Sequence, residues 1–212
     1  MYLENRNIYQ LLRKAKLAKV QTPEHLQPLA DWIKKKYGVM PLWFTEDYID
    51  SGGRPRLNVI FEWKKEEDLF YNVSNYGEFN KRKQNAIAKK YEELCPEKKG
   101  VWVIYSNFEY SACYAANNKI SKEDKASIIR QFPEIWEIQT FTIYTSVFFF
   151  TDKQLKAAEQ SGLNQKIREA YYKLLQQHDE FGYYTLENCG LYFDSKENFD
   201  TNFQSNWYNY YR

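Results

Sequence analysis

The residues best suited by type and spacing to do chemistry lie near the C-terminus. The segment "YFDSKENFD" (192–200) carries three acids, Asp194, Glu197 and Asp200. Closely spaced carboxylates can act as general acid and base or hold a divalent metal ion. The match to a calcium-binding loop is incomplete, because the Gly of the sixth position and the Glu of the twelfth are missing. A small metal-dependent hydrolase that uses these acids and His178 is therefore one alternative function.

Side chains that activate nucleophiles are scarce and scattered. His178 lies on the apolar stripe of its predicted helix, where a core histidine is expected, and His25 has no nucleophile close by in the sequence. Cys95, Cys113 and Cys189 form no CxxC pair, and the chain has no motif of the P-loop, zinc-protease or serine-hydrolase kind. We therefore expect no catalytic residues, no metal site and no cofactor.

The composition argues against two classes of function. The formal net charge is +2 and many strand aromatics lie among acids and amides, so nucleic-acid binding is not expected. A basic amphipathic helix is predicted over residues 1–20. This helix could bind nucleic acid, so a nucleic-acid-associated protein is a second alternative function. The other interpretation is that the helix simply packs on the rest of the protein. No apolar run approaches the ~20 residues that cross a bilayer, so no membrane partner is expected. The scattered cysteines predict a reduced, cytoplasmic chain.

Helical periodicity and capping residues divide the chain into alternating helices and strand-rich runs. Two pairs, Ser121 with Asp124 and Thr151 with Gln154, have the spacing of capping boxes that start helices. Helices are predicted over residues 22–38, 77–94, 121–132, 151–162 and 164–182. Hairpins are predicted over 41–63, 100–116 and 183–195, one or two strands over 135–150, and a terminal strand over 206–212.

This order of elements predicts an α+β fold. We expect mainly antiparallel sheet structure built from repeated helix–hairpin units, with amphipathic helices packed on one face. No shift in composition marks a linker, which favours a single domain over residues 1–212. The alternative is two related lobes, about 22–112 and 113–212, preceded by the basic helix.

An internal match supports the two-lobe alternative. The segment "IFEWKKEED" (60–68) repeats the pattern of "YFDSKENFD" (192–200) at one aromatic residue, two acids and one lysine. The matched pairs are Phe61 and Phe193, Glu62 and Asp194, Lys64 and Lys196, and Asp68 and Asp200. Two copies of a folding unit are commoner than two copies of an active site in so short a chain. The pattern therefore indicates a repeated strand end, with the aromatic rings inward and the acids outward.

The last third of the chain resembles a known class of binding protein. Its segments "SVFFFTDKQLKAAEQSG", "EFGYYTLENCGLYFDSKENFD" and "NWYNYY" are similar to cytosolic immunity proteins of bacterial polymorphic-toxin and contact-dependent secretion systems. Such proteins are α+β, rich in Tyr, Trp and Asn, and free of catalytic motifs. Many that act against nucleases are strongly acidic, whereas this chain is slightly basic, so the class of toxin stays open.

The resemblance implies a non-enzymatic cytosolic protein that neutralises a toxin domain by blocking its active site. Clustered acids would steer the encounter and aromatic anchors would be buried in it. The oligomeric state stays open. If Asp194, Glu197 and Asp200 are buried or paired internally, their docking role is lost. The candidate partner-binding residues are Asp47, Asp50, Glu62, Trp63, Glu66, Asp68, Tyr192, Asp194, Glu197, Asp200, Trp207 and Tyr208.

Overall fold

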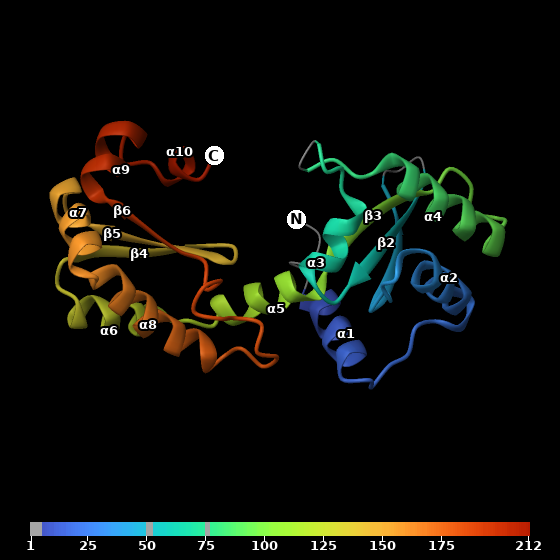
Figure 1. Cartoon of the computed structure of the whole chain (residues 1–212), viewed down its shortest axis with the longest axis horizontal. Coiled ribbons are helices and arrows are strands. Elements are labelled where there is room, and N and C mark those ends of the chain that lie inside the picture. Colours follow the sequence, from blue (N-terminus) through green and yellow to red (C-terminus); the bar gives the residue numbers. More distant parts are fainter. Residues whose placement is uncertain (1–5, 50–52, 75–76) are drawn as a thin grey trace. The chain divides into compact units, whose positions relative to one another are not determined.

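The computed structural model describes residues 6–49, 53–74 and 77–212, and the chain divides into two compact units (Figure 1). Unit 1 is Met1–Ser111 and unit 2 is Ala112–Arg212. The division falls one residue before the boundary expected for two lobes. In the part of the chain that the structure describes, no helix combines the length and apolar character of a membrane span.

Unit 1 contains a three-stranded sheet in the order β1-β2-β3. Strands β1 (Trp43–Tyr48) and β2 (Pro55–Phe61) pair antiparallel as a hairpin, whereas β3 (Trp102–Asn107) pairs parallel to β2. A parallel neighbour needs a crossover connection. Here the crossover consists of α3 (Lys64–Glu67), η2 (Asp68–Phe70) and α4 (Lys81–Leu94).

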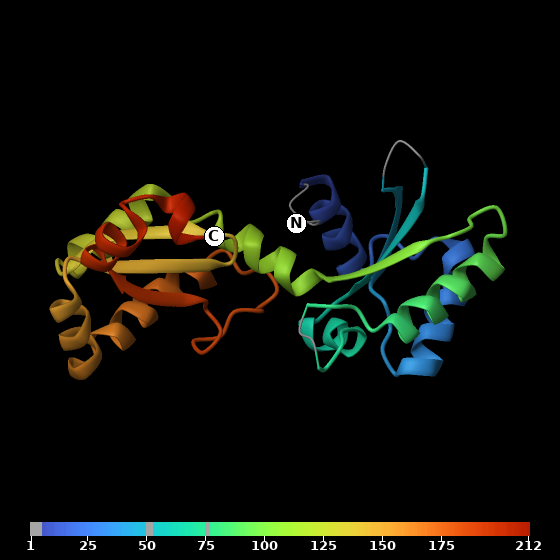
Figure 2. The same ribbon diagram turned by 90° about the horizontal axis from the view of Figure 1, so that it is seen from above.

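The core of unit 1 lies between its sheet and two helices. Alternate residues of β2, Leu57, Val59 and Phe61, pack in one cluster with α2 (Gln27–Tyr37) and α4. Each such fully buried side chain contributes about 1.5–3 kcal/mol to the free energy of unfolding. Helix α1 (Arg6–Lys16) lies on the opposite side of the sheet (Figure 2). The short η1 (Glu24–Leu26) leads into α2.

Unit 2 repeats this arrangement in the order β4-β5-β6. Strands β4 (Ile135–Phe141) and β5 (Tyr144–Phe149) form an antiparallel hairpin, and β6 (Leu191–Ser195) adds parallel to β5. The crossover consists of α7 (Asp152–Ser161) and α8 (Leu163–Gln176). The unit also contains α6 (Lys122–Gln131), α9 (Lys196–Phe203) and α10 (Trp207–Tyr210), and α5 (Phe108–Asn117) leads into it from β3.

The two faces of the second sheet are covered by different helices. On one face the hydroxyl oxygens of Thr145 in β5 and Tyr171 in α8 lie 2.9 Å apart. On the other face Phe148 of β5 packs against Trp207 of α10, with ring centroids 5.3 Å apart. Because side chains alternate along a strand, these contacts place α8 and α10 on opposite faces.

The predicted α+β class is confirmed, with three differences in its details. The sheets are mixed rather than mainly antiparallel, because the third strand of each unit arrives by a crossover. Helices cover both faces of each sheet rather than one. The expected hairpins over 100–116 and 183–195 and the terminal strand over 206–212 are wrong: β3 and β6 each run directly into a helix, and α10 occupies the last segment.

The errors share one physical cause. Asn107, Ser195 and Asn206 lie in segments predicted as hairpins or a strand, but each accepts a hydrogen bond from a backbone N–H of the following helix. The donors are Tyr110 at 2.7 Å, Asn198 at 2.9 Å and Tyr208 at 2.9 Å. Asn and Ser favour turns and helix N-caps alike, so their presence alone does not distinguish the two. The capping boxes at Ser121 and Thr151 are confirmed.

The matched segments 60–68 and 192–200 have the same local structure but different places in the sheets. Each is the end of a strand followed by a helix, and each forms a Lys–Asp pair at i,i+4, Lys64–Asp68 and Lys196–Asp200. However, β2 is the central strand of its sheet and β6 is an edge strand. By strand order the counterpart of β2 is β5, not β6. The match between segments 60–68 and 192–200 therefore marks two similar strand-to-helix junctions and not two equivalent strands.

Candidate functional site

The three acids of the segment 192–200 are all engaged within unit 2. Asp194 accepts hydrogen bonds from the Tyr210 hydroxyl at 2.7 Å and from the amide of Asn198 at 2.9 and 3.0 Å. Glu197 accepts from the backbone N–H of Asp152 at 3.1 Å. These carboxylates therefore hold β6, α7 and α10 together.

Asp200 is engaged within its own helix and the turn after it. Its carboxylate pairs with Lys196 and accepts from the Ser205 hydroxyl at 2.6 Å. Hydrogen bonds from Lys196 and Ser205 hold the pKa of Asp200 below its usual value. Asp194, Glu197 and Asp200 thus all have internal partners, which is the condition under which no docking role was expected of them.

The candidate acids of unit 1 are also paired. Asp47 accepts two hydrogen bonds from the Arg56 guanidinium, at 2.7 and 2.5 Å. Glu62 pairs with Lys16 of α1 at 2.5 Å. Glu66 accepts a hydrogen bond from the backbone N–H of Trp63 at 3.1 Å at the start of α3, and Asp68, just after α3, accepts one from Lys64 at 2.6 Å. Asp50 lies outside the described residues.

The candidate aromatic anchors divide into packed and exposed side chains. Trp207 stacks on Phe199 with ring centroids 4.1 Å apart, inside an aromatic cluster that covers Phe148. Trp63 is half-buried beside Lys65, whose Nζ lies 5.3 Å from the ring centroid. In contrast, Tyr192 and Tyr208 are 55% and 70% exposed.

Tyr192 belongs to a group of exposed rings on one face of the second sheet, here called the aromatic surface. It consists of Phe141 of β4, Tyr144 of β5 and Tyr192 of β6, which are 48%, 44% and 55% exposed. Phe141 and Tyr144 are directly paired in register, and the centroids of Tyr144 and Tyr192 lie 5.6 Å apart. These residues share the face of Phe148 that α10 covers further along the strands.

Two features fix these rings in place. The Phe141 ring stacks on Tyr211, with centroids 4.7 Å apart, which ties the edge of the aromatic surface to the segment after α10. Gly190, with φ +64°, lets β6 approach the turn of the β4–β5 hairpin. A Cβ at this position would lie 2.8 Å from the carbonyl oxygen of Ile143, so only glycine permits the observed approach.

Phe141 and Tyr144 were not among the residues expected from the sequence. The prediction of one or two strands over residues 135–150 does not specify the turn at 142–143 or the cross-strand pairing that it creates. Their signal is a pair of aromatic residues flanking a two-residue turn, which places both on the same face. Tyr192 was among the expected residues, but Tyr144, whose ring contacts that of Tyr192 from the neighbouring strand, was not.

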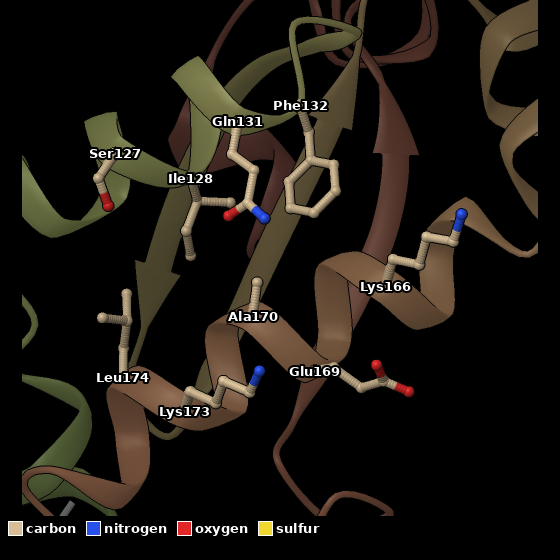
Figure 3. Close-up of a pocket in the computed structure, with 9 residues that line it drawn as sticks. All are labelled: Ser127, Ile128, Gln131, Phe132, Lys166, Glu169, Ala170, Lys173 and Leu174. Carbon is tan, nitrogen blue, oxygen red and sulfur yellow. The ribbon is translucent and has the colours of Figure 1, made fainter.

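A second feature of unit 2 is a groove between α6 and α8, on the opposite face from the aromatic surface (Figure 3). The groove has a volume of about 360 Å³. Its apolar lining comes from Ile128 and Phe132 on one side and from Ala170 and Leu174 of α8 on the other. Its polar lining is Ser127, Gln131, Lys166, Glu169 and Lys173.

In the described parts of both units, the side chains that could ligate a metal do not gather into one site. No group of three or more His, Cys, Asp and Glu side chains there is placed to hold a metal ion. His25 lies 3.2 Å from the carboxylate of Glu46, which also accepts a hydrogen bond from the buried Tyr91. All three cysteines are buried and without a disulfide.

One buried carboxyl stands out in unit 1. Glu67 of α3 accepts hydrogen bonds from the Asn107 amide at 2.5 Å and the Tyr71 hydroxyl at 2.9 Å. Burial raises the pKa of this carboxyl, and the hydrogen bonds from Asn107 and Tyr71 partly oppose the rise. Since all of its contacts are internal, Glu67 joins α3 to the end of β3.

Comparison of the chain with protein-family models, with curated proteins and with solved structures finds no match.

Proposed function

We propose that this chain is a non-enzymatic binding protein that docks a protein partner on its aromatic surface. The observation that carries the proposal is the placement of Phe141, Tyr144 and Tyr192. These three rings come from adjacent strands, are directed to one face and are each about half exposed. Contiguous exposed aromatic side chains mark interaction sites, because burying them on a partner releases much apolar surface from water.

The aromatic surface suits a folded protein better than a nucleic acid. Stacking platforms for single strands lie in positively charged grooves, whereas the charged residue nearest on the same strand face is Asp194. Tyr rings offer both apolar area and a hydroxyl at the rim, the combination enriched in protein interfaces. Because the rings stand on hydrogen-bonded strands, little conformational entropy is lost when a partner covers them.

The partner we propose is a toxin domain whose active site the chain blocks, with binding taking place in the cytoplasm. The similarity of the last third of the chain to immunity proteins supports this partner, and one of the similar segments, residues 180–200, contains Tyr192. The buried, unbridged cysteines support a reducing compartment.

Growth rescue tests the proposal. The chain is co-expressed with each toxin-like domain found among the products of neighbouring genes, and cells are expected to survive expression of one of them. The double variant Tyr144→Ser, Tyr192→Ser should abolish rescue while the chain accumulates to the same level. The matched control is Phe150→Ser, an exposed aromatic residue just beyond the far end of β5, which should rescue fully. Rescue by the double variant, or failure of the wild-type chain to bind the toxin domain, would contradict the proposal.

A further inference from the structure

Six cations gather at one end of unit 1, where the last turn of α2 lies beside the first turn of α4. They are here called the basic cluster, which consists of Lys34, Lys35 and Lys36 of α2 and Lys81, Arg82 and Lys83 of α4. The ring of Tyr37 joins the two helices, because its centroid lies 5.5 Å from Nζ of Lys36 and 5.7 Å from Nζ of Lys83. Nζ of Lys36 also lies 4.6 Å from the ring centroid of Trp32. Two basic runs that are distant in the sequence therefore form one surface around two half-buried aromatic rings.

The positive charge of the basic cluster is not offset by acids. None of its six side chains forms an ion pair with a carboxylate in the described part of the chain, and all except Lys83 are exposed. Lys83 donates to the backbone carbonyl oxygen of Leu69, which is also uncharged. The first turn of α4 contains no acid, whereas α6, α7 and α9 each begin with at least one. Because cations at the positive end of a helix raise its energy, the charge at the start of α4 does not serve the stability of the fold.

This excess of positive charge is confined to unit 1. Unit 1 contains more Lys and Arg than Asp and Glu, and unit 2 contains more Asp and Glu than Lys and Arg. The net charge of +2 for the whole chain conceals this difference. A bound anion responds mainly to charges within a Debye length, which is about 8–10 Å at physiological salt. The basic cluster can therefore attract a polyanion although the chain as a whole is nearly neutral.

We infer that the basic cluster binds single-stranded nucleic acid, with phosphates on its cations and bases on the rings of Trp32 and Tyr37. Sites for single strands combine positive charge along the backbone with aromatic rings on which bases stack. Both features occur here on one surface, and the flexible side chain of Lys36 can turn from the rings to a phosphate when a base takes its place. The bases of a duplex are stacked on one another, so the two rings favour a single strand.

Two other anionic partners fit the basic cluster less well. Protein interfaces are depleted in lysine, whereas nucleic-acid interfaces are strongly positive. Helices that bind a membrane surface insert an apolar face into the lipid, but the apolar faces of α2 and α4 are buried in the core of unit 1. The basic cluster belongs to unit 1 and the aromatic surface to unit 2, so this inference holds or fails independently of the proposed toxin contact.

Fluorescence anisotropy with the full chain tests the inference. The probe is a fluorescein-labelled oligothymidylate of about 12 nucleotides, a length within the usual site sizes for single strands. Its affinity should fall at least about tenfold between about 50 and about 200 mM salt, as three or more phosphate contacts require. An abasic strand of the same length has the same phosphates but no bases, so it should bind at least about tenfold more weakly.

Three outcomes of these measurements would overturn the inference. The first is that the oligothymidylate does not bind at the lower salt concentration. The second is that the abasic strand binds equally well, because the cluster would then attract any polyanion. The third is that vesicles containing phosphatidylserine displace the oligothymidylate, because the surface would then recognise lipid headgroups as well.

Paired charge reversals locate the binding. Lys35→Glu with Arg82→Glu reverses two exposed charges of the basic cluster without removing a ring, so it should weaken oligothymidylate binding by about tenfold or more. Lys153→Glu with Lys156→Glu on α7 is the matched control, because it makes the same charge change on exposed lysines of unit 2, and it should alter the affinity less than about twofold. Circular dichroism checks that both variants are folded. If the control weakens binding as much as the cluster variant, attraction to the whole chain explains the result and the inference is wrong.

Discussion

The rings of Tyr144 and Tyr192 lie 5.6 Å apart at an interplanar angle of 69°. The two residues stand on β5 and β6, which are separated in the sequence by the crossover of α7 and α8. Their contact exists because β6 adds parallel to β5, with Thr145 beside Leu191 and Ser146 beside Tyr192. The aromatic surface is thus a product of the sheet topology.

Single substitutions on the aromatic surface should weaken partner binding. Tyr144→Ala and Tyr192→Ala each remove an exposed ring, so the affinity for the toxin domain identified by growth rescue should fall about tenfold or more. Isothermal titration calorimetry measures this change. Phe150→Ala should leave the affinity unaltered, and an equal loss for Phe150→Ala would mean that the partner does not recognise the aromatic surface.

Gly190 should be the glycine most sensitive to substitution. Gly190→Ala places a Cβ 2.8 Å from the Ile143 carbonyl oxygen and also strains a residue with φ +64°. We expect a loss of about 1–3 kcal/mol in the free energy of unfolding. Gly182→Ala is the control, because Gly182 has φ +69° but nothing within 4 Å of its added Cβ. Urea denaturation should show the smaller loss for Gly182→Ala; equal losses would show that backbone strain alone matters.

The buried hydroxyl of Tyr171 should be important for the stability of unit 2. It donates to the side-chain oxygen of Asn117 at 2.8 Å and lies 2.9 Å from the Thr145 hydroxyl. Tyr171→Phe removes the shortest hydrogen bonds of these buried groups and leaves them only the longer contacts of 3.3–3.4 Å with each other and with Thr140, so the free energy of unfolding should fall by about 1–3 kcal/mol. Tyr172→Phe is the comparison variant, because it removes a hydroxyl that is only half-buried from the next residue of the same helix. A loss for Tyr172→Phe as large as that for Tyr171→Phe would contradict this account.

Glu67 should make unit 1 less stable as the pH rises. Its pKa is raised above the ordinary value of 4.5 because burial disfavours the charged carboxylate. The folded state therefore holds a proton that the unfolded state has released, and stability falls as the pH rises from 4.5 through the folded-state pKa. Below 4.5 both states are protonated and Glu67 adds no pH dependence.

Glu67→Gln tests this prediction, because glutamine does not titrate and keeps one acceptor for Asn107 or Tyr71. Urea denaturation at a series of pH values should give a flatter stability curve for the variant above pH 4.5. Exposed acids such as Asp200, whose pKa is lowered by Lys196 and Ser205, act in the opposite direction in both proteins and cancel in the difference. Parallel curves would show that Glu67 does not titrate differently in the folded state.

Signals that act over a few residues were readable from the sequence. The capping boxes at Ser121 and Thr151 were predicted and are present, and the matched Lys–Asp pairs have the same geometry at two strand-to-helix junctions. The α+β class followed from the alternation of helical and strand periods. Asn107 and Ser195 were misread because the same side chains serve turns and helix caps.

The hydrogen-bond donors to the candidate acids could not be predicted from the sequence. Asp194 was expected to face a partner, but Tyr210 and Asn198 donate to it, and Tyr210 comes from a helix that was expected to be a strand. Phe141 and Tyr144 were missed because their exposure depends on how much of the sheet face α10 covers. The groove of unit 2 was missed because it requires two helices to be packed side by side.

By itself, the sequence determined where the helices capped by Ser121 and Thr151 begin and which residues alternate into a core. Those properties depend on local hydrogen bonds and on the period of apolar residues, which act between close neighbours in the chain. Only the tertiary structure decided that β3 and β6 add parallel, which places Tyr192 beside Tyr144 and leaves their rings uncovered. The pairing of distant strands depends on the whole crossover and on the packing of its helices, and no short segment encodes it.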